Sequence, residues 1–520
     1  MALAYGLSPD THKTKMFKRL SARNAALLYG TVTCLLWALV PTLLFPNPPL
    51  DVVEGFAWGR ELALGYTKHP PMQAWLLEAT YRLTGGHVFG GYWLSAACVG
   101  LSYIAIWKLA RRLRISPAGA LWSILLTSIT FYFTQPLPEF NPNILQIPVW
   151  AWMILLFHQA LANGKKTDWL LLGAVAAFGL YTKYFVALLV GAIGLYVLVF
   201  PRARRCLLTA GPWLAALTCV ILLIPHIWWL FQTDFLTLQY AASRSKTAVG
   251  ILDHILNPLS FFGAQLGNHA ALILAVLVGL GVAGLKHRND PATPALPKDL
   301  QSKVFVLWFA FLPLSVLLLA GLSTGNEFEH MWGTPMFVLS GLAAVYLLDL
   351  PKRFRHQKAA LSLVVLVQAT FIVLAIGQAT LEPRWKAKQT RMHYPGEAVA
   401  LALSQAWKNE MGSELRYIAG DMWSAANVTI HAPERPSMFY LHDVELSPWI
   451  NLSDVQNKGL MIVWRGTNDQ PLAELLRFYP NARRQSSIDI DYAGNGIIPP
   501  VTVNWLIIPP GSVAVEPMAN

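Results

Sequence analysis

Charged residues are scarce in this chain. Only 13% of its 520 residues are Asp, Glu, Lys or Arg, whereas a soluble domain carries about 25%. More than half of the residues, 55%, are hydrophobic. This composition excludes an ordinary water-soluble enzyme and predicts a polytopic α-helical membrane protein.

Cysteine is also rare, and its four residues lie in or beside apolar runs: Cys34, Cys98, Cys206 and Cys219. Their spacing fits neither a metal site nor a disulfide framework. The sequence contains no repeat, coiled coil or nucleotide-binding loop. Basic residues outnumber acidic ones, 40 to 28, but they cluster in short loops between apolar runs. Such loops set the orientation of a protein in the membrane, so the positive charge does not indicate nucleic-acid binding.

Apolar runs long enough to cross a bilayer, roughly 20 residues each, continue to residue 380. Basic residues precede the first run without a cleavage pattern, so we expect a retained signal anchor and a cytoplasmic N-terminus. Keeping the basic loops inside predicts about eleven crossings: 25–46, 88–107, 118–134, 144–162, two short ones within 169–200, 207–230, 269–285, 303–322, 332–350 and 359–380. The outer loops are then 47–87, 135–143, 231–268 and 323–331.

Two features refine this topology. Basic residues flank both ends of the run 169–200, so we expect the run to cross twice, which places Lys183 in a tight outer turn. A single tilted helix is the alternative, but it would invert the topology downstream and break the charge rule. From residue 381 the apolar residues come in short clusters separated by Gly, Pro, Asn and Asp. We therefore predict two domains, a transmembrane catalytic domain over 1–380 and a soluble extracytoplasmic α/β domain over 381–520.

The first outer loop contains the stretch 51–75, DVVEGFAWGRELALGYTKHPPMQAW. Asp51 and Glu54 are three residues apart, a spacing that places both carboxylates on one face of a helix. The prolines after Lys68 and His69 cannot continue a helix. The sequence thus predicts an acidic short helix and a basic stiff turn at the membrane surface, where charged residues usually mark a function.

Other unusual charges also fall in the predicted outer loops: Glu139, Lys183, Arg244, Lys246, Glu327 and His330. Chemistry on the outer side has no ATP or soluble sugar nucleotide available. We therefore expect an activated donor that is carried in the membrane.

The Asp at the end of the first span, the GYTKHPP turn and a C-terminal extracytoplasmic domain resemble the GT-C superfamily of membrane glycosyltransferases. The bacterial branch of protein O-mannosyltransferases and lipid A aminoarabinose transferases is the most similar. The resemblance implies that Asp51 is the general base of an inverting displacement from a polyprenyl-phosphate sugar. It also implies that Lys68 binds the donor phosphate, and Lys183, Arg244 and Lys246 are further candidates.

The second acid is less well defined by the resemblance. Related enzymes often carry an Asp in the second outer loop, whereas this chain has Glu139 as the acid and Asn143 at the other candidate position. Glu54 is a further catalytic candidate. Asp51 and Glu54 alone are few ligands for a hard cation, which prefers six or more oxygens, so the sequence leaves the use of a divalent metal open.

Each candidate also has a structural interpretation. Asp51 is a favoured N-cap residue, Glu54 suits the first turn of a helix, and Lys68 can extend from the interface to water. His69 can shape its turn by hydrogen bonding, and His330 can be an ordinary interfacial histidine. Arg244 and Lys246 can instead contact lipid headgroups.

The sequence therefore predicts a multi-pass glycosyltransferase of the bacterial inner membrane. It would transfer a sugar from a polyprenyl-phosphate donor to lipid A or lipopolysaccharide, another surface glycan or a protein, on the periplasmic face. Two alternatives are a secondary transporter, which would keep its charges mid-membrane in two similar halves, and a lipid-linked glycan polymerase or ligase. The sugar, prenol and acceptor are not identified by the sequence.

Overall fold

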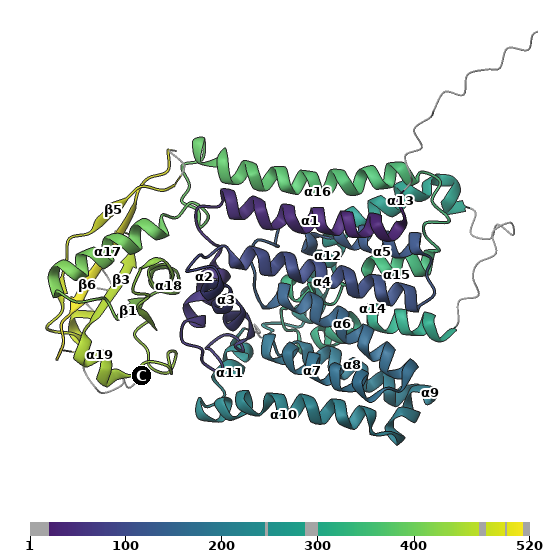
Figure 1. Cartoon of the computed structure of the whole chain (residues 1–520), viewed down its shortest axis with the longest axis horizontal. Coiled ribbons are helices and arrows are strands. Elements are labelled where there is room, and N and C mark those ends of the chain that lie inside the picture. Colours follow the sequence, from purple (N-terminus) through teal and green to yellow (C-terminus); the bar gives the residue numbers. More distant parts are fainter. Residues whose placement is uncertain (1–19, 245–247, 287–299, 467–474, 494–496, 513–520) are drawn as a thin grey trace, which may run out of the picture.

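The computed structural model describes residues 20–244, 248–286, 300–466, 475–493 and 497–512. Long helices form a bundle along the longest axis of the molecule, and the C-terminal domain lies against one end of it (Figure 1). The short helices α2 and α3 lie between the bundle and that domain (Figure 1).

Within the described residues, six helices are long and apolar enough to cross a membrane, or up to eight if each of two bent pairs counts as one span. The six are α1 (Ala22–Leu44), α4 (Gly90–Arg112), α6 (Pro142–Asn163), α10 (Ala210–Gln232), α14 (Leu300–Thr324) and α16 (Gln357–Thr380). The bent pairs are α8 (Val186–Val199) with α9 (Pro201–Arg204) and η2 (Arg205–Leu208), and α12 (Asp253–Asn268) with α13 (Ala270–Lys286). The chain is thus a multi-pass helical membrane protein.

The predicted number of eleven crossings is not confirmed. Two predicted spans contain only short α-helices, α5 (Pro117–Ser128) and α15 (Ser340–Leu348), beside 3-10 turns η1 (Phe131–Phe133) and η3 (His330–Gly333). The predicted outer loop 231–268 instead contains α11 (Leu236–Ser243) and α12. The predicted break at Lys183 is present, because α7 (Lys166–Thr182) ends directly before it and α8 begins at Val186.

The predicted short helix after the first span is α2 (Leu50–Gly59), which packs against α3 (Met72–Leu83). Every α2 residue from Val52 to Gly59 is buried. A Cβ atom on Gly59 would lie 2.5 Å from the backbone oxygen of Ala74, so only glycine permits this approach of the two helices. Close packing thus fixes α2 relative to the turn that carries Lys68.

The C-terminal part forms a mixed α/β domain. Its sheet has the order β2-β1-β3-β6-β4, with β5 also paired to β6, and β6 is antiparallel to its neighbours whereas β1 is parallel to β2 and β3. The elements are η4 (Glu382–Arg384), α17 (Gly396–Met411), β1 (Tyr417–Gly420), α18 (Met422–His431), β2 (Ser437–Tyr440), α19 (Leu452–Lys458), β3 (Leu460–Arg465), β4 (Arg483–Arg484), β5 (Ile488–Ile490) and β6 (Val501–Ile508). The predicted change of architecture after residue 381 is therefore present.

This domain docks onto the α2–α3 segment through polar contacts. Arg435 pairs with the buried carboxylate of Glu78 on α3 at 2.9 Å, and its guanidinium lies 3.8 Å from the ring centre of Tyr81. Ser437 donates to Glu61 at 2.7 Å, and the Thr67 hydroxyl donates to a backbone oxygen of the domain, also at 2.7 Å. The C-terminal domain thus supports α2 and α3, which lie between it and the bundle.

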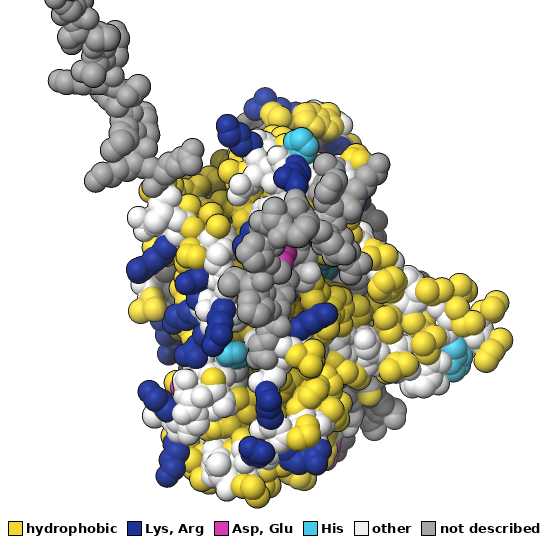
Figure 2. All heavy atoms as spheres, turned by 90° about the vertical axis from the view of Figure 1, so that its right-hand side faces the viewer, with side chains coloured by type: hydrophobic (Ala, Val, Ile, Leu, Met, Phe, Trp, Pro, Cys, Tyr) yellow, Lys and Arg dark blue, Asp and Glu magenta, His cyan; other side chains and the backbone are white. Residues whose placement is uncertain are grey.

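The opposite end of the bundle is basic. In the face that points away from the C-terminal domain, Lys and Arg side chains are numerous and acidic ones are few (Figure 2). Arg23 at the start of α1 and Arg111 and Arg112 at the end of α4 belong to the helix ends on this side. The two ends of the membrane bundle are therefore chemically distinct.

Candidate active site

A cavity of about 280 Å³ lies where α2, the Lys68 turn, the start of α6 and the break after α7 meet. Its polar lining brings together most of the residues that the sequence singled out. The charged and amide-bearing lining residues are Asp51, Glu54, Lys68, His69, Asn143, Lys183, Arg244 and Glu329. Tyr184, Tyr240, Met331 and Trp332 contribute much of the remaining wall.

Asp51 occupies the first turn of α2, where a carboxylate is stabilised by the helix dipole. Pro49 is the N-cap residue, so the interpretation of Asp51 as the N-cap is wrong. Gln73 donates to the backbone oxygen of Asp51 at 2.8 Å and to that of Phe140 at 3.0 Å, which ties α3 to both loops. Burial raises the pKa of Asp51, although a hydrogen bond from Asn141 and nearby cations oppose the shift.

Glu139 contacts Asp51 but does not line the Asp51 cavity. Its Oε1 accepts a hydrogen bond from the backbone amide of Asp51 at 3.3 Å. The side chain lines a second cavity, of about 590 Å³, which α1, α16 and the segment 131–139 enclose with Phe45, Pro49 and Met392. Burial and the negative charge of Asp51 raise the pKa of Glu139 to about 7. The Asp51 and Glu139 pair therefore lies between two cavities.

Glu54 forms a buried ion pair with Lys68, whose Nζ lies 2.6 Å from Glu54 Oε2. The pair crosses from α2 to the turn before the two prolines; the sequence predicted the acidic helix and the basic turn but not this contact. Burial raises the pKa of Glu54 to about 7 despite the cation beside it. Much of the charge of Lys68 is thus already neutralised by its partner.

Lys183 lies in the break between α7 and α8 and points into the same cavity. Its Nζ donates to Asn143 Oδ1 at 2.8 Å and lies 5.7 Å from the ring centre of Trp332. The Asn143 amide nitrogen in turn lies 3.2 Å from the Met331 sulfur, which orients the amide oxygen toward the lysine. Burial lowers the pKa of Lys183 to about 8. The ammonium therefore contacts a neutral amide, not a carboxylate, at hydrogen-bond distance.

Arg244 lies at the edge of the cavity, half exposed, and forms an ion pair with Glu329. The other cation predicted in this segment, Lys246, lies outside the described residues. His69 lines the cavity, and burial together with Lys183 and Lys68 lowers its pKa to about 3, so the ring is neutral. His330 is exposed and does not line the cavity; its backbone oxygen accepts hydrogen bonds from neighbouring side chains.

Three contributors to this region were not among the candidate site residues predicted from the sequence. Glu329 precedes His330 in the loop and forms an ion pair with Arg244 at the edge of the cavity. His226 Nδ1 donates a hydrogen bond to a backbone oxygen at 2.7 Å, so the Nε2 of the neutral ring is an acceptor. The Tyr184 hydroxyl donates to this Nε2 at 2.8 Å. Arg391, in the segment before α17, is close enough to lower the pKa of both Asp51 and Glu139. These contacts join segments that are far apart in the chain.

The side chains present do not fit a dedicated site for a divalent metal. Among the described residues, no group of three or more His, Cys, Asp or Glu side chains has the geometry to hold an ion. Glu54 is engaged with Lys68, and a hard cation prefers six or more oxygen ligands.

Comparison with known proteins identifies the relatives of the chain. Residues 68–229 match the family described as dolichyl-phosphate-mannose-protein mannosyltransferase. Lipid A galacturonosyltransferase RgtD of Rhizobium johnstonii is 23% identical over 317 residues, which cover 59% of this chain and 62% of RgtD. Undecaprenyl phosphate-alpha-4-amino-4-deoxy-L-arabinose arabinosyl transferase 1 of Pseudomonas fluorescens is 28% identical over 173 residues, which cover 32% of this chain and 31% of the relative's length. The aligned region thus spans less than two thirds of either curated relative.

The fold is similar to that of a solved structure along almost the whole chain. ArnT from Cupriavidus metallidurans in the apo state aligns with a TM-score of 0.60 at 12% identity, over 96% of this chain and 100% of ArnT. The same protein bound to undecaprenyl phosphate gives a TM-score of 0.58 at 12% identity, over 95% and 100%. The resemblance predicted from the sequence is therefore confirmed: this chain is similar to the GT-C glycosyltransferases, in the branch that contains bacterial lipid A sugar transferases, and it has the fold of ArnT.

Proposed function

We propose that this protein is an inverting glycosyltransferase that moves a sugar from a polyprenyl-phosphate donor to a hydroxyl of a lipid A-type glycolipid. One observation carries the proposal: the half-buried Asp51 carboxylate and three basic side chains, Lys68, Lys183 and Arg244, line one cavity. Relatives whose names include lipid A and undecaprenyl phosphate support these two substrate classes.

In the proposed reaction, the acceptor hydroxyl oxygen attacks the anomeric carbon of the donor sugar as its proton passes to Asp51. The bond between the anomeric carbon and the phosphate oxygen breaks, and its electron pair leaves with polyprenyl phosphate. A hydroxyl is a weak nucleophile, and a positioned carboxylate accelerates such a step by roughly 100-fold to 10,000-fold. The pKa of Asp51, raised by burial, makes it a stronger base than an exposed aspartate.

Negative charge develops on the leaving phosphate, and fixed cations stabilise it. Lys183 is the best placed of them, because its hydrogen-bond partner is the neutral Asn143 amide. Lys68 shares its charge with Glu54, and Arg244 shares its charge with Glu329. We therefore assign Lys183 the main contact with the donor phosphate and the other two cations supporting contacts.

The second cavity suits the acceptor. Among the described residues, its lining includes Glu139 and aromatic side chains from α1 and α16 and no Lys or Arg, whereas the Asp51 cavity offers three cations to an anionic prenyl phosphate. Trp37 and Phe371 offer apolar surface of the kind on which the face of a sugar ring packs. An acceptor held on this side would approach the Asp51 and Glu139 pair from the face opposite the donor.

The orientation of the protein follows from its charges. The basic end of the bundle, shown in Figure 2, matches the cytoplasmic surface, where Lys and Arg accumulate. The active site and the C-terminal domain would then face the periplasm from the inner membrane. Labelling of a single cysteine placed at exposed Leu62, in an otherwise cysteine-free chain, by a membrane-impermeant reagent added outside spheroplasts tests this orientation.

Purified protein in nanodiscs, supplied with labelled polyprenyl-phosphate sugar and lipid A, tests the reaction. Asp51→Asn should bind the donor but transfer sugar at least about 100-fold more slowly, as expected for loss of a general base. Glu382→Gln removes a carboxylate of an exposed ion pair in η4 and serves as the control. Full transfer by Asp51→Asn would remove Asp51 from the role of base. Mass spectrometry of lipid A from cells without the gene identifies the sugar.

A further inference from the structure

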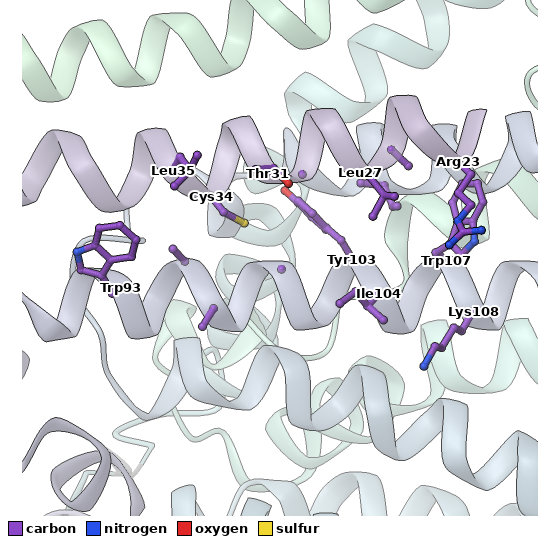
Figure 3. A pocket seen from close by; sticks show the side chains of 16 residues that line it. Arg23, Leu27, Thr31, Cys34, Leu35, Trp93, Tyr103, Ile104, Trp107 and Lys108 are labelled. Carbon is purple, nitrogen blue, oxygen red and sulfur yellow. The ribbon is translucent and has the colours of Figure 1, made fainter. Parts of the chain in front are cut away.

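A groove of about 500 Å³ runs between α1 and α4, separate from both cavities described above. Its walls are mostly apolar, with Leu27 and Leu35 on α1 and Trp93 and Ile104 on α4 (Figure 3). The groove shares no lining residue with the Asp51 cavity or the Glu139 cavity. The groove is therefore a feature separate from the candidate active site.

Two cations lie at one end of this groove. Arg23, at the start of α1, and Lys108, near the end of α4, both line it beside Trp107 (Figure 3). Both side chains are exposed, and among the described residues neither forms an ion pair with a carboxylate. Lys108 Nζ lies 4.9 Å from the ring centre of Trp152, a contact with a neutral ring that leaves the charge of the ammonium uncompensated. One end of an apolar groove thus carries uncompensated positive charge.

The groove is long enough for an acyl chain of one leaflet. Arg23 and Leu35 are 12 positions apart on α1, about 18 Å at 1.5 Å per residue, and Trp93 and Lys108 are 15 positions apart on α4, about 22 Å. Half of the hydrocarbon core measures about 15 Å. α1 starts at Ala22 and runs toward Asp51, so the cationic end belongs to the leaflet away from the active site.

We propose that this groove binds an anionic glycerophospholipid of that leaflet, with its phosphate headgroup at Arg23 and Lys108 and an acyl chain along α1 and α4. Its chemistry differs from that of the donor cavity, where the cations are accompanied by Asp51, Glu54 and Glu329. The site does not depend on the proposed sugar transfer. It would fix the contact between the first two long helices, which lie side by side at the front of the bundle (Figure 1).

Native mass spectrometry of the full chain in detergent, with phosphatidylglycerol and phosphatidylcholine of identical acyl chains added, tests the proposal. Wild-type protein should retain phosphatidylglycerol in preference to phosphatidylcholine. A cation near a membrane surface strengthens binding of an anionic lipid about fivefold, so the double variant Arg23→Ala, Lys108→Ala should lose about 25-fold of this preference. Arg112→Ala, at the same helix end but outside the groove, should leave the preference unchanged.

A second variant tests the apolar part. Ala97 is exposed and lines the groove, so Ala97→Phe fills it without disturbing the core and should reduce retention of both lipids. Leu28→Phe, on the exposed face of α1 outside the groove, is the matched control. Equal retention of the two lipids by the wild type, or unchanged retention by the variants, would overturn the proposal. A dimer that Ala97→Phe separates would also overturn it, because a second copy would then fill the groove.

Discussion

The backbone amide of Asp51 donates a hydrogen bond to Glu139 Oε1, and the two carboxyl groups belong to two different cavities. The negative charge of Asp51 raises the pKa of Glu139, so the ionisation of the two groups is linked. Under the proposed function, Glu139 would influence the base without touching the donor.

This relationship predicts the pH profile of sugar transfer. The base must be ionised, so the rate falls as pH falls through its pKa, which burial has raised. Glu139→Gln removes a nearby negative charge and should move this acid limb to lower pH, since the pKa of Asp51 then decreases. The logarithm of kcat/KM measured between pH 4.5 and 8.5 checks the shift. An acid limb that stays in place would show that Glu139 does not influence the base. Gln378→Glu adds a carboxylate to the cavity that Glu139 lines and should shift the acid limb to higher pH.

Lys183 and Lys68 should differ in their effect on the donor. A hydrogen bond to a charged group contributes about 1.5–3 kcal/mol, so Lys183→Gln should raise KM for the polyprenyl-phosphate donor by about tenfold or more. Lys68→Gln should raise it less, because Glu54 already neutralises much of that charge. Initial rates at varied donor and fixed acceptor concentrations check the order. Lys165→Gln, in a helix-linking loop at the basic end, is the control, and a larger effect of Lys68 would reverse the assignment.

The buried Glu54 and Lys68 pair predicts a pH-dependent stability. The pKa of Glu54 is about 7 in the folded protein, above its ordinary value of 4.5. Folding therefore favours the protonated group, and this contribution is present below pH 4.5 and is lost as pH rises through 7. The melting temperature of the wild type should therefore fall between pH 5 and pH 8, and that of Glu54→Gln should fall less. Scanning fluorimetry in detergent measures it, and an unchanged decrease would contradict the prediction.

Removal of the cation alone should be more harmful than removal of the pair. Lys68→Met leaves the Glu54 carboxylate buried without a partner, which costs roughly 3–5 kcal/mol at a pH where it is ionised. The double variant Glu54→Gln, Lys68→Met removes that charge and should recover most of the loss. Denaturation at pH 8 checks the comparison. If the double variant were no more stable than Lys68→Met, the pair would not be the source of the instability.

Arg435 should hold the C-terminal domain against α3. Arg435→Ala leaves the buried Glu78 carboxylate with Arg82 alone, whose side chain is 61% exposed. We expect faster hydrogen exchange in α2 and α3 and a loss of stability of roughly 3 kcal/mol. Arg416→Ala, which breaks an exposed ion pair with Glu414, should have little effect. Exchange rates that change equally in both variants would argue against a specific role of Arg435.

The sequence predicted those parts of the molecule that depend on local chemistry. Prolines after His69 and the carboxylates at Asp51 and Glu54 determined the short helix and the turn, and both are present. The break at Lys183 followed from basic residues on both sides of one apolar run. The number of spans could not be predicted in the same way, because apolar runs such as 118–134 include a 3-10 segment that hydropathy does not distinguish from an α-helix.

The contacts that assemble the site could not be predicted because they join distant segments. Lys183 and Asn143 are 40 positions apart, and Arg244 and Glu329 are 85 apart. Nothing local near Arg391 indicates that it lies close to Asp51. The catalytic role of Asp51 and the phosphate role of the lysines remain predictions that the experiments above test.

The docking of the C-terminal domain on α2 and α3 has a consequence for biosynthesis. Arg435 and Ser437, which support the segment that carries Asp51, follow it by more than 370 positions in the printed sequence. The ribosome must therefore complete the transmembrane helices and the first strands of the sheet before α2 and α3 have their supporting contacts. A nascent or prematurely terminated chain would lie in the membrane without the contacts that hold the segment with Asp51, so under the proposed function it would not consume lipid-linked sugar.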